Sequence, residues 1–176
     1  MAELEIHTDS GHTSDPSGQR VGLLAASLAV ALGIVTIASH RTHTRAVVVR
    51  AEANDQWQYH QSRRIKYHIL ELGEDLIALL SSQNAGAQRV IQRYEKEKAR
   101  YQAECKETEE RARKKEEEVE RAERRALRYD VGEGFLEIGL VVTSLYFLSG
   151  KKLFPGMGAV AGIIGVAIAA SGLMIV

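Results

Sequence analysis

The sequence has few of the residues that build covalent, metal or nucleic-acid sites. It contains one cysteine, Cys105, which excludes an intramolecular disulfide and a zinc site built on paired cysteines. Its 23 basic and 23 acidic residues cancel, whereas a nucleic-acid partner requires a basic surface that neutralises phosphates. The composition therefore argues against redox chemistry and against nucleic-acid binding.

The chain also lacks the short motifs that mark common active sites. No GxGxxG, phosphate-binding loop, HExxH or GxSxG segment occurs, and no two carboxylates have a context typical of general acid–base catalysis. His40 and His43 have the spacing of two metal ligands, but no third ligand is near them, so a role at the head-group boundary is favoured. We therefore expect no enzyme activity, no metal and no cofactor.

What the chain has instead is charge in its middle and apolar runs toward both ends. Between positions 40 and 134 lie 20 of the basic and 18 of the acidic residues. Residues 21–39 carry no charge, and their length matches the roughly 20 residues that cross a bilayer core of about 30 Å. Residues 135–150 and 153–176 form two further apolar runs. The sequence predicts an all-α integral membrane protein with three transmembrane helices.

The charged middle, residues 40–134, predicts a long antiparallel helical hairpin outside the membrane. Helical composition covers 41–80 and 87–130, with a turn at 81–86. Residues 1–20 are polar and rich in Ser, Thr and Gly, which predicts a disordered tail.

Both predicted arms carry the alternating three- and four-residue spacing of a coiled coil. The expected seam of the first arm is Ile65, Ile69, Leu72, Leu76 and Leu79. The expected seam of the second arm is Ala87, Ile91, Tyr94, Lys98, Tyr101, Cys105, Thr108, Ala112, Lys115, Val119, Ala122, Ala126 and Tyr129.

The stretch DQWQYHQ, residues 55–61, is expected to form a contact between helices, with aromatic packing anchors and a hydrogen-bonding seam, rather than a catalytic cleft. In the last apolar run, small residues recur every four positions and let helices approach closely, within one chain or between chains. The predicted oligomer or partner contacts are Asp55, Gln56, Trp57, Tyr59, His60, Gln61, Ile65, Gly158, Gly162 and Gly165.

Glu137 is the one acidic residue inside an apolar run, and burying a charge in lipid is costly. It is the predicted intramembrane polar site, and one hypothesis is that it belongs to a path for protons or ions. Because it lies only two residues into its run, we expect its side chain to reach the head-group region, with Arg41 or Arg128 as its partner.

Basic residues near the predicted spans indicate the side of the hairpin. Seven lie on the hairpin side and three on the other, which favours a hairpin in the cytoplasm. The seven are Arg41, Arg45, Arg50, Arg121, Arg124, Arg125 and Arg128, and the three are Arg20, Lys151 and Lys152.

The segment NDQWQYHQSRRIK, residues 54–66, together with the order of apolar runs, resembles the bacterial membrane family catalogued as domain of unknown function 4337. That family has a segment like S-D-Q-W-x-Y-Y-Q-x-K-x-I-K after its first span. The positions that depart from it are Asn54, His60 and Arg63. The resemblance implies a multi-pass protein of the bacterial cytoplasmic membrane and brings no known activity, substrate or cofactor. The matching positions are Asp55, Gln56, Trp57, Tyr59, Gln61, Ile65 and Lys66.

Three functions remain open at this point. The first is a non-enzymatic membrane scaffold that self-associates through its spans and its hairpin. The second is an accessory subunit of a larger membrane complex. The third is an ion-conducting oligomer that uses Glu137 and the glycine-rich last span. The expected partners are membrane lipid, further copies of the chain and other membrane subunits.

Overall fold

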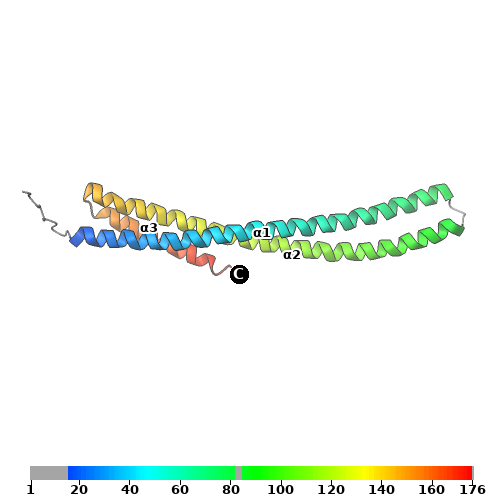
Figure 1. Cartoon of the computed structure of the whole chain (residues 1–176), viewed down its shortest axis with the longest axis horizontal. Coiled ribbons are helices and arrows are strands. Elements are labelled where there is room, and N and C mark those ends of the chain that lie inside the picture. Colours follow the sequence, from blue (N-terminus) through cyan, green and yellow to red (C-terminus); the bar gives the residue numbers. More distant parts are fainter. Residues whose placement is uncertain (1–15, 82–84, 176) are drawn as a thin grey trace, which may run out of the picture. The chain divides into compact units, whose positions relative to one another are not determined.

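The computed structural model describes residues 16–81 and 85–175 as three helices, and no strand occurs within these ranges (Figure 1). The helices are α1 (Pro16–Ser81), α2 (Ala85–Ser149) and α3 (Leu153–Gly172). Each is long and apolar enough, by length and composition, to cross a membrane. The all-helical prediction is confirmed. The centre of the predicted turn, 82–84, and residues 1–15 of the predicted tail lie outside the described residues.

Helix α1 begins at Pro16, so the predicted disordered tail is wrong for residues 16–20. Proline is favoured in the first turn of a helix, because its fixed φ suits the helix and its missing N–H has no partner to lose there. Residues 17–20 then continue the helix into the first apolar run without a break. The apolar runs and the charged arms share the continuous helices α1 and α2.

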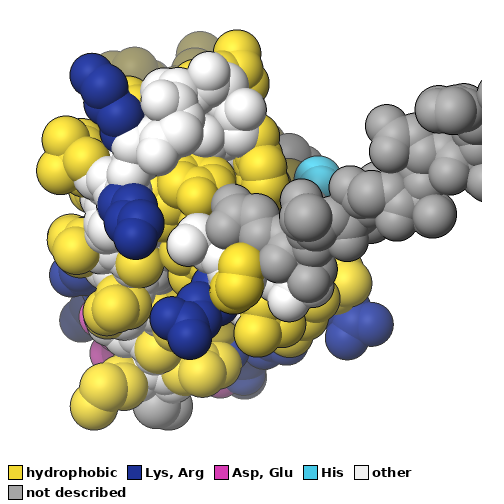
Figure 2. Space-filling view, turned by 90° about the vertical axis from the view of Figure 1, so that its left-hand side faces the viewer, with side chains coloured by type: hydrophobic (Ala, Val, Ile, Leu, Met, Phe, Trp, Pro, Cys, Tyr) yellow, Lys and Arg dark blue, Asp and Glu magenta, His cyan; other side chains and the backbone are white. Residues whose placement is uncertain are grey.

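Helix α2 ends in a glycine turn that leads directly into α3. Gly150 has a φ of 67°, which favours glycine, and its N–H donates to the carbonyl of Tyr146 at 2.8 Å. Three residues later α3 begins at Leu153, and Pro155 lies in its first turn, where proline is favoured. Figure 2, which looks at this end, shows basic side chains among hydrophobic ones, as expected at the boundary of membrane-spanning helices.

The described residues form two compact units. The first, the three-helix unit, comprises α1 up to Ala38, α2 from Arg128 and the whole of α3. All three helices contribute to its core. The buried core residues are Leu28, Val35, Tyr129, Leu136 and Ala169.

The second unit comprises residues 39–127 and the residues that follow α3; its main part, called here the hairpin unit, is residues 39–127 of α1 and α2, which run antiparallel. Contacts near the turn join Gly73 to Tyr94, and contacts farther along join His60 to Thr108. The predicted antiparallel hairpin therefore has the right direction. A small cluster of Val49, Ala53 and Val119 forms its buried core.

The predicted seam of α2 is confirmed, because every one of its positions from Ala87 to Tyr129 is buried or half-buried. The predicted seam of α1 is wrong. Its five members are exposed, with exposed fractions of 52% for Ile65, 61% for Ile69, 60% for Leu72, 48% for Leu76 and 83% for Leu79.

The face of α1 that meets α2 holds a second row with the same spacing. At about 100° per residue, positions two apart point about 200° apart, so this row lies on the opposite side of α1 from the five aliphatic residues. The row contains apolar, polar and charged residues, so the spacing of apolar residues alone does not identify it. Its members are Val49, Ala53, Gln56, His60, Arg63, Tyr67, Leu70, Glu74 and Ile77.

Specific contacts select the mixed row over the aliphatic one. A side chain at Gly73 would lie 2.7 Å from the Tyr94 ring, so the ring fits only against glycine. Nearby, Lys98 Nζ donates to Glu74 at 2.5 Å across the hairpin. These contacts require the α1 face that carries Gly73 and Glu74, and so leave the aliphatic residues facing away from α2.

Candidate interaction sites

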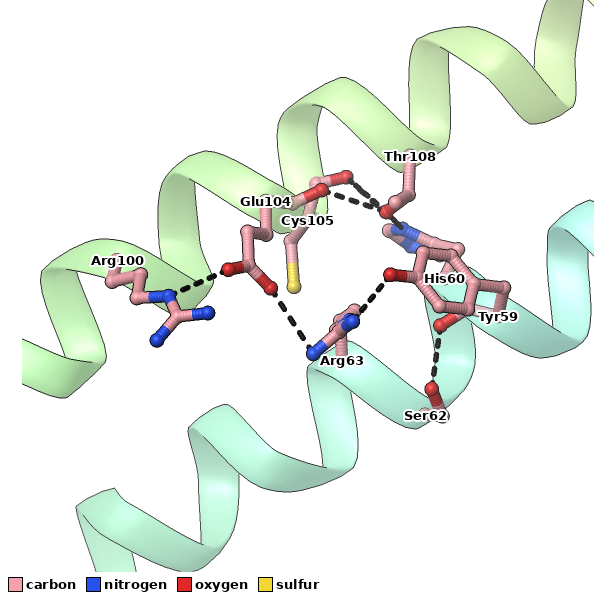
Figure 3. Close-up of polar contacts among 8 residues, drawn as sticks. All are labelled: Tyr59, His60, Ser62, Arg63, Arg100, Glu104, Cys105 and Thr108. Carbon is pink, nitrogen blue, oxygen red and sulfur yellow. Dashed lines mark hydrogen bonds and ion pairs between the residues drawn. The ribbon is translucent and has the colours of Figure 1, made fainter.

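His60, one of the predicted contact residues, is a buried polar residue of the hairpin (Figure 3). Its Nδ1 lies 3.1 Å from the carbonyl oxygen of Cys105 and 3.2 Å from the hydroxyl of Thr108. A carbonyl oxygen only accepts, so the Cys105 contact requires a hydrogen on Nδ1. Trp57 meets the imidazole edge-on, with ring centroids 5.7 Å apart. His60 thus joins α1 to α2 within one chain.

Arg63 makes the second polar link across the hairpin (Figure 3). Its guanidinium lies 3.2 Å from a carboxylate oxygen of Glu104 and 4.6 Å from the centre of the Tyr59 ring, whose hydroxyl it also contacts. The hydrogen bond to Tyr59 and the charge of Glu104 raise the pKa of Arg63 above its ordinary value. The spacing of the sequence places Arg63 on one helix face with Asp55 and Tyr59, but it does not reveal the contact with Glu104 on α2.

The other predicted contacts of this stretch differ in exposure. Asp55, Tyr59 and Gln61 are exposed, and Gln56 and Trp57 are half-buried. The structure therefore divides the stretch into residues that close the hairpin within the chain and residues on its free surface.

Beside Trp57, an open groove of about 490 Å³ runs between α1 and α2. Within it Arg113 donates to Glu109 at 2.8 Å, which lowers the pKa of that carboxyl. Among the described residues no group of three His, Cys, Asp or Glu is placed to hold a metal ion. The groove is lined by Trp57, His60, Arg64, Tyr67, His68, Gln102, Cys105, Lys106, Glu109 and Arg113.

Cys105 is expected to react slowly with thiol reagents. Burial raises the pKa of its thiol, so less reactive thiolate is present at neutral pH. We expect alkylation at least about threefold slower than that of a cysteine placed at the exposed Ala103 in a Cys105→Ser chain, with the difference lost in denaturant. Mass spectrometry of iodoacetamide time courses measures both rates, and equal rates in the folded protein would contradict the assigned burial.

One exposed apolar feature of the hairpin unit is the row Ile65, Ile69, Leu72, Leu76 and Leu79 on α1, called here the aliphatic stripe. Ile65 is the only predicted contact residue among them. The whole row could have been found as a contact candidate, since its spacing is plain in the sequence, but it was assigned to the interior of the hairpin.

The three-helix unit is closed by glycines. A side chain at Gly158 would lie 2.0 Å from the Thr143 hydroxyl and 2.6 Å from the Gly139 carbonyl. One at Gly165 would lie 2.7 Å from the Gly132 carbonyl. The predicted small-residue contacts thus lie between α2 and α3 of the same chain.

The third predicted glycine contact involves α1. A side chain at Gly162 would lie 2.2 Å from a methyl group of Leu28, so α1 and α3 meet there. Both Gly162 and Leu28 are buried.

Two of the three carboxyl side chains that α2 contributes to the three-helix unit, Glu133 and Glu137, have different surroundings. Glu133 is half-buried and accepts a hydrogen bond from the Thr36 hydroxyl of α1 at 2.7 Å. Sequence reasoning missed it, because it lies just before the apolar run that begins at Phe135. Glu137, the predicted intramembrane site, is exposed on α2.

His40 and His43, considered above as half of a metal site, are both exposed on α1. They gain no third ligand among the described residues.

A family model described as "Domain of unknown function (DUF4337)" matches residues 17–175. No curated protein and no solved structure matches the chain.

Proposed function

The chain belongs to the DUF4337 family, which is defined without a function, and from its geometry we propose that it is a membrane-anchored, non-enzymatic assembly protein. Its copies associate through the aliphatic stripe of α1. The hairpin unit is the part that projects from the membrane, on the cytoplasmic side according to the distribution of basic residues.

Anchoring in the membrane is supported by the composition of the three-helix unit. Each of its helices supplies a stretch long and apolar enough to cross a bilayer. Large aliphatic side chains point outward from it, among them Val30, Ile34 and Ile163, which are 65%, 64% and 70% exposed. Such a surface suits lipid rather than water.

The single observation that carries self-association is the exposed aliphatic stripe. Contiguous exposed apolar surface on a water-facing segment marks an interaction site, and full burial of each large aliphatic side chain contributes about 1.5–3 kcal/mol. The row alternates steps of four and three, the spacing with which two helices interlock in a coiled coil. The same row on a second copy offers a matching surface.

The hairpin itself adds a reason for a further helix. The face of α1 against α2 holds Ala53, His60 and Arg63, which bury little apolar surface. A two-helix hairpin with so mixed a seam gains stability when a neighbour covers the opposite, aliphatic face of α1.

Replacing Leu72 and Leu76 together by serine is expected to dissociate the assembly. Loss of two large side chains from each interacting copy should raise the dissociation constant at least about 100-fold. Light scattering coupled to size-exclusion chromatography in mild detergent measures the particle mass over a dilution series.

The matched control replaces Val47 and Val48 by serine. Both are aliphatic residues of α1 outside the stripe, with exposed fractions of 69% and 50%. The control should keep the mass of the unmodified protein. A monomeric unmodified protein, or equal masses for the stripe variant and the unmodified protein, would refute self-association through the stripe. Co-purification of a different subunit with a monomeric chain would instead support the accessory-subunit alternative.

A further inference from the structure

The glycine contacts between α2 and α3 show how deep Glu137 lies in the three-helix unit. Gly139 on α2 meets Gly158 and Gly162 of α3, and Gly132 meets Gly165 and Ala169. Glu137 falls between these two contacts, so it lies level with the middle of α3, which runs from Leu153 to Gly172.

The position of Glu137 level with the middle of α3 differs from the sequence-based expectation that its carboxyl group reaches the head-group region. The apolar run of α2 begins at Phe135, which suggested that the carboxyl group reaches the head groups. The antiparallel α3, however, still covers α2 at Gly132, nearly one turn before Phe135, and α3 continues for three residues beyond Ala169, to Gly172. When α3 crosses the bilayer, Glu137 lies near its midplane.

No other described part of the chain covers the side of α2 that carries Glu137. Glu133 is covered by Thr36, whereas Glu137 is exposed. Glu137 belongs to a row whose steps alternate between three and four, the spacing of a helix seam. Its members, called here the carboxyl row, are Gly134, Glu137, Val141, Ser144 and Leu148.

The carboxyl row lies away from the face that packs inside the chain. The covered face of α2 holds Leu136, Gly139, Thr143 and Tyr146. By contrast, Val141 and Leu148 are 61% and 84% exposed. Helix α2 therefore presents two seams, of which its own chain fills only one.

We propose that the carboxyl row is an intramembrane interface with a second copy of the chain, in which the two Glu137 carboxyl groups hydrogen-bond each other. This rests on the proposed function, because it requires that α2 and α3 cross the bilayer. A polar group left in hydrocarbon without a partner is costly, so Glu137 needs a partner at its own depth.

The chemistry of the carboxyl group makes a second copy the fitting occupant. A protonated carboxyl both donates and accepts, so two of them satisfy each other. The apolar runs 21–39, 135–150 and 153–176 contain no Lys or Arg, so at this depth the chain offers no cation to pair with a carboxylate.

The geometry of the row also fits a second copy. Copies in one membrane share their orientation, so two α2 helices that meet run parallel and each residue faces its own counterpart across a two-fold axis. At Gly134 a side chain would meet nothing within 4 Å, which leaves room for a close approach of the two helices.

Disulfide crosslinking in native membranes tests this interface. In a Cys105→Ser chain, Gly134→Cys or Val141→Cys should give a covalent dimer upon oxidation with copper phenanthroline. Val30→Cys, exposed on α1 of the same unit, should give at least about fivefold less dimer, because only facing positions bring two sulfurs together.

Variants at Glu137 test the role of the carboxyl group in the Val141→Cys chain. Glu137→Leu should lower the dimer yield at least about fivefold, whereas Glu137→Gln should keep it, since an amide also both donates and accepts. An undiminished yield with Glu137→Leu would overturn the carboxyl pairing.

A cysteine at Leu72 in the aliphatic stripe separates this inference from the proposed function. Crosslinked dimers at Leu72 with none at Gly134 and Val141 would overturn the intramembrane interface and leave the proposed function standing. Absence of dimers at all three positions would overturn both. Crosslinks from Val141→Cys to a different protein would replace the second copy by a foreign partner and overturn the proposal.

Discussion

Gly158→Ala is expected to destabilise the packing of α3 on α2 by about 2 kcal/mol, within the range of about 1–3 kcal/mol for overpacked interiors. The added methyl group would lie 2.0 Å from the hydroxyl oxygen of Thr143 and 2.6 Å from the carbonyl oxygen of Gly139. Thr143 is fully buried and its hydroxyl donates to the Gly139 carbonyl at 2.7 Å, so neither atom can retreat without loss.

Gly156→Ala is the matched control for Gly158→Ala. Gly156 lies in the same helix, but a side chain there would meet nothing within 4 Å. Alanine is favoured over glycine in helices by up to about 1 kcal/mol, so this variant should be neutral or slightly more stable. Unfolding in mixed detergent micelles, followed by circular dichroism, gives the two free energies. Equal values for the two variants would contradict the close contact at Gly158.

Ala112→Leu is expected to force α1 and α2 apart in the hairpin unit. Ala112 has no exposed surface and lies in the buried row of α2 between Thr108 and Val119. A leucine there adds three carbon atoms to a filled seam, which costs about 1–3 kcal/mol. The separation should also weaken the link between His60 and Thr108, one turn away.

The control for Ala112→Leu is Ala103→Leu, on the exposed side of α2. Alanine and leucine have similar helix propensity, so the pair isolates the effect of burial. Limited proteolysis with trypsin reports opening of the hairpin, because its arms are rich in Lys and Arg. Ala112→Leu should be cut faster than Ala103→Leu. Equal cleavage would show that the seam can accommodate a leucine.

The two arms of the hairpin show what sequence can and cannot predict. The seam of α2 was found because polar and charged residues cover its remaining surface, so that only one row was available. Helix α1 carries two rows with the same spacing, and apolar content favoured the wrong one. What decides between them is the fit of Tyr94 against Gly73 and the pairing of Lys98 with Glu74, and these depend on both helices at once.

The three-helix unit shows the same dependence on both partners of a contact. Small residues at Gly158, Gly162 and Gly165 were recognised as a contact surface from their spacing. Their partners Gly132 and Gly139 on α2 were not, because the α2 row is interrupted by larger side chains such as Leu136. The depth of Glu137 depends on the register of α3, which the position of Phe135 alone does not reveal.

The glycine contact between α2 and α3 has a consequence for how the protein responds to temperature. In the proposed membrane-spanning arrangement there is no water to release between these helices, so close packing rather than the hydrophobic effect holds Gly139 against Gly158. Such a contact lacks the large heat-capacity change that weakens apolar burial on cooling. Association through the aliphatic stripe removes apolar surface from water, so it does carry that heat-capacity change. Cooling should therefore loosen the association of copies through the stripe before it loosens the fold of the three-helix unit.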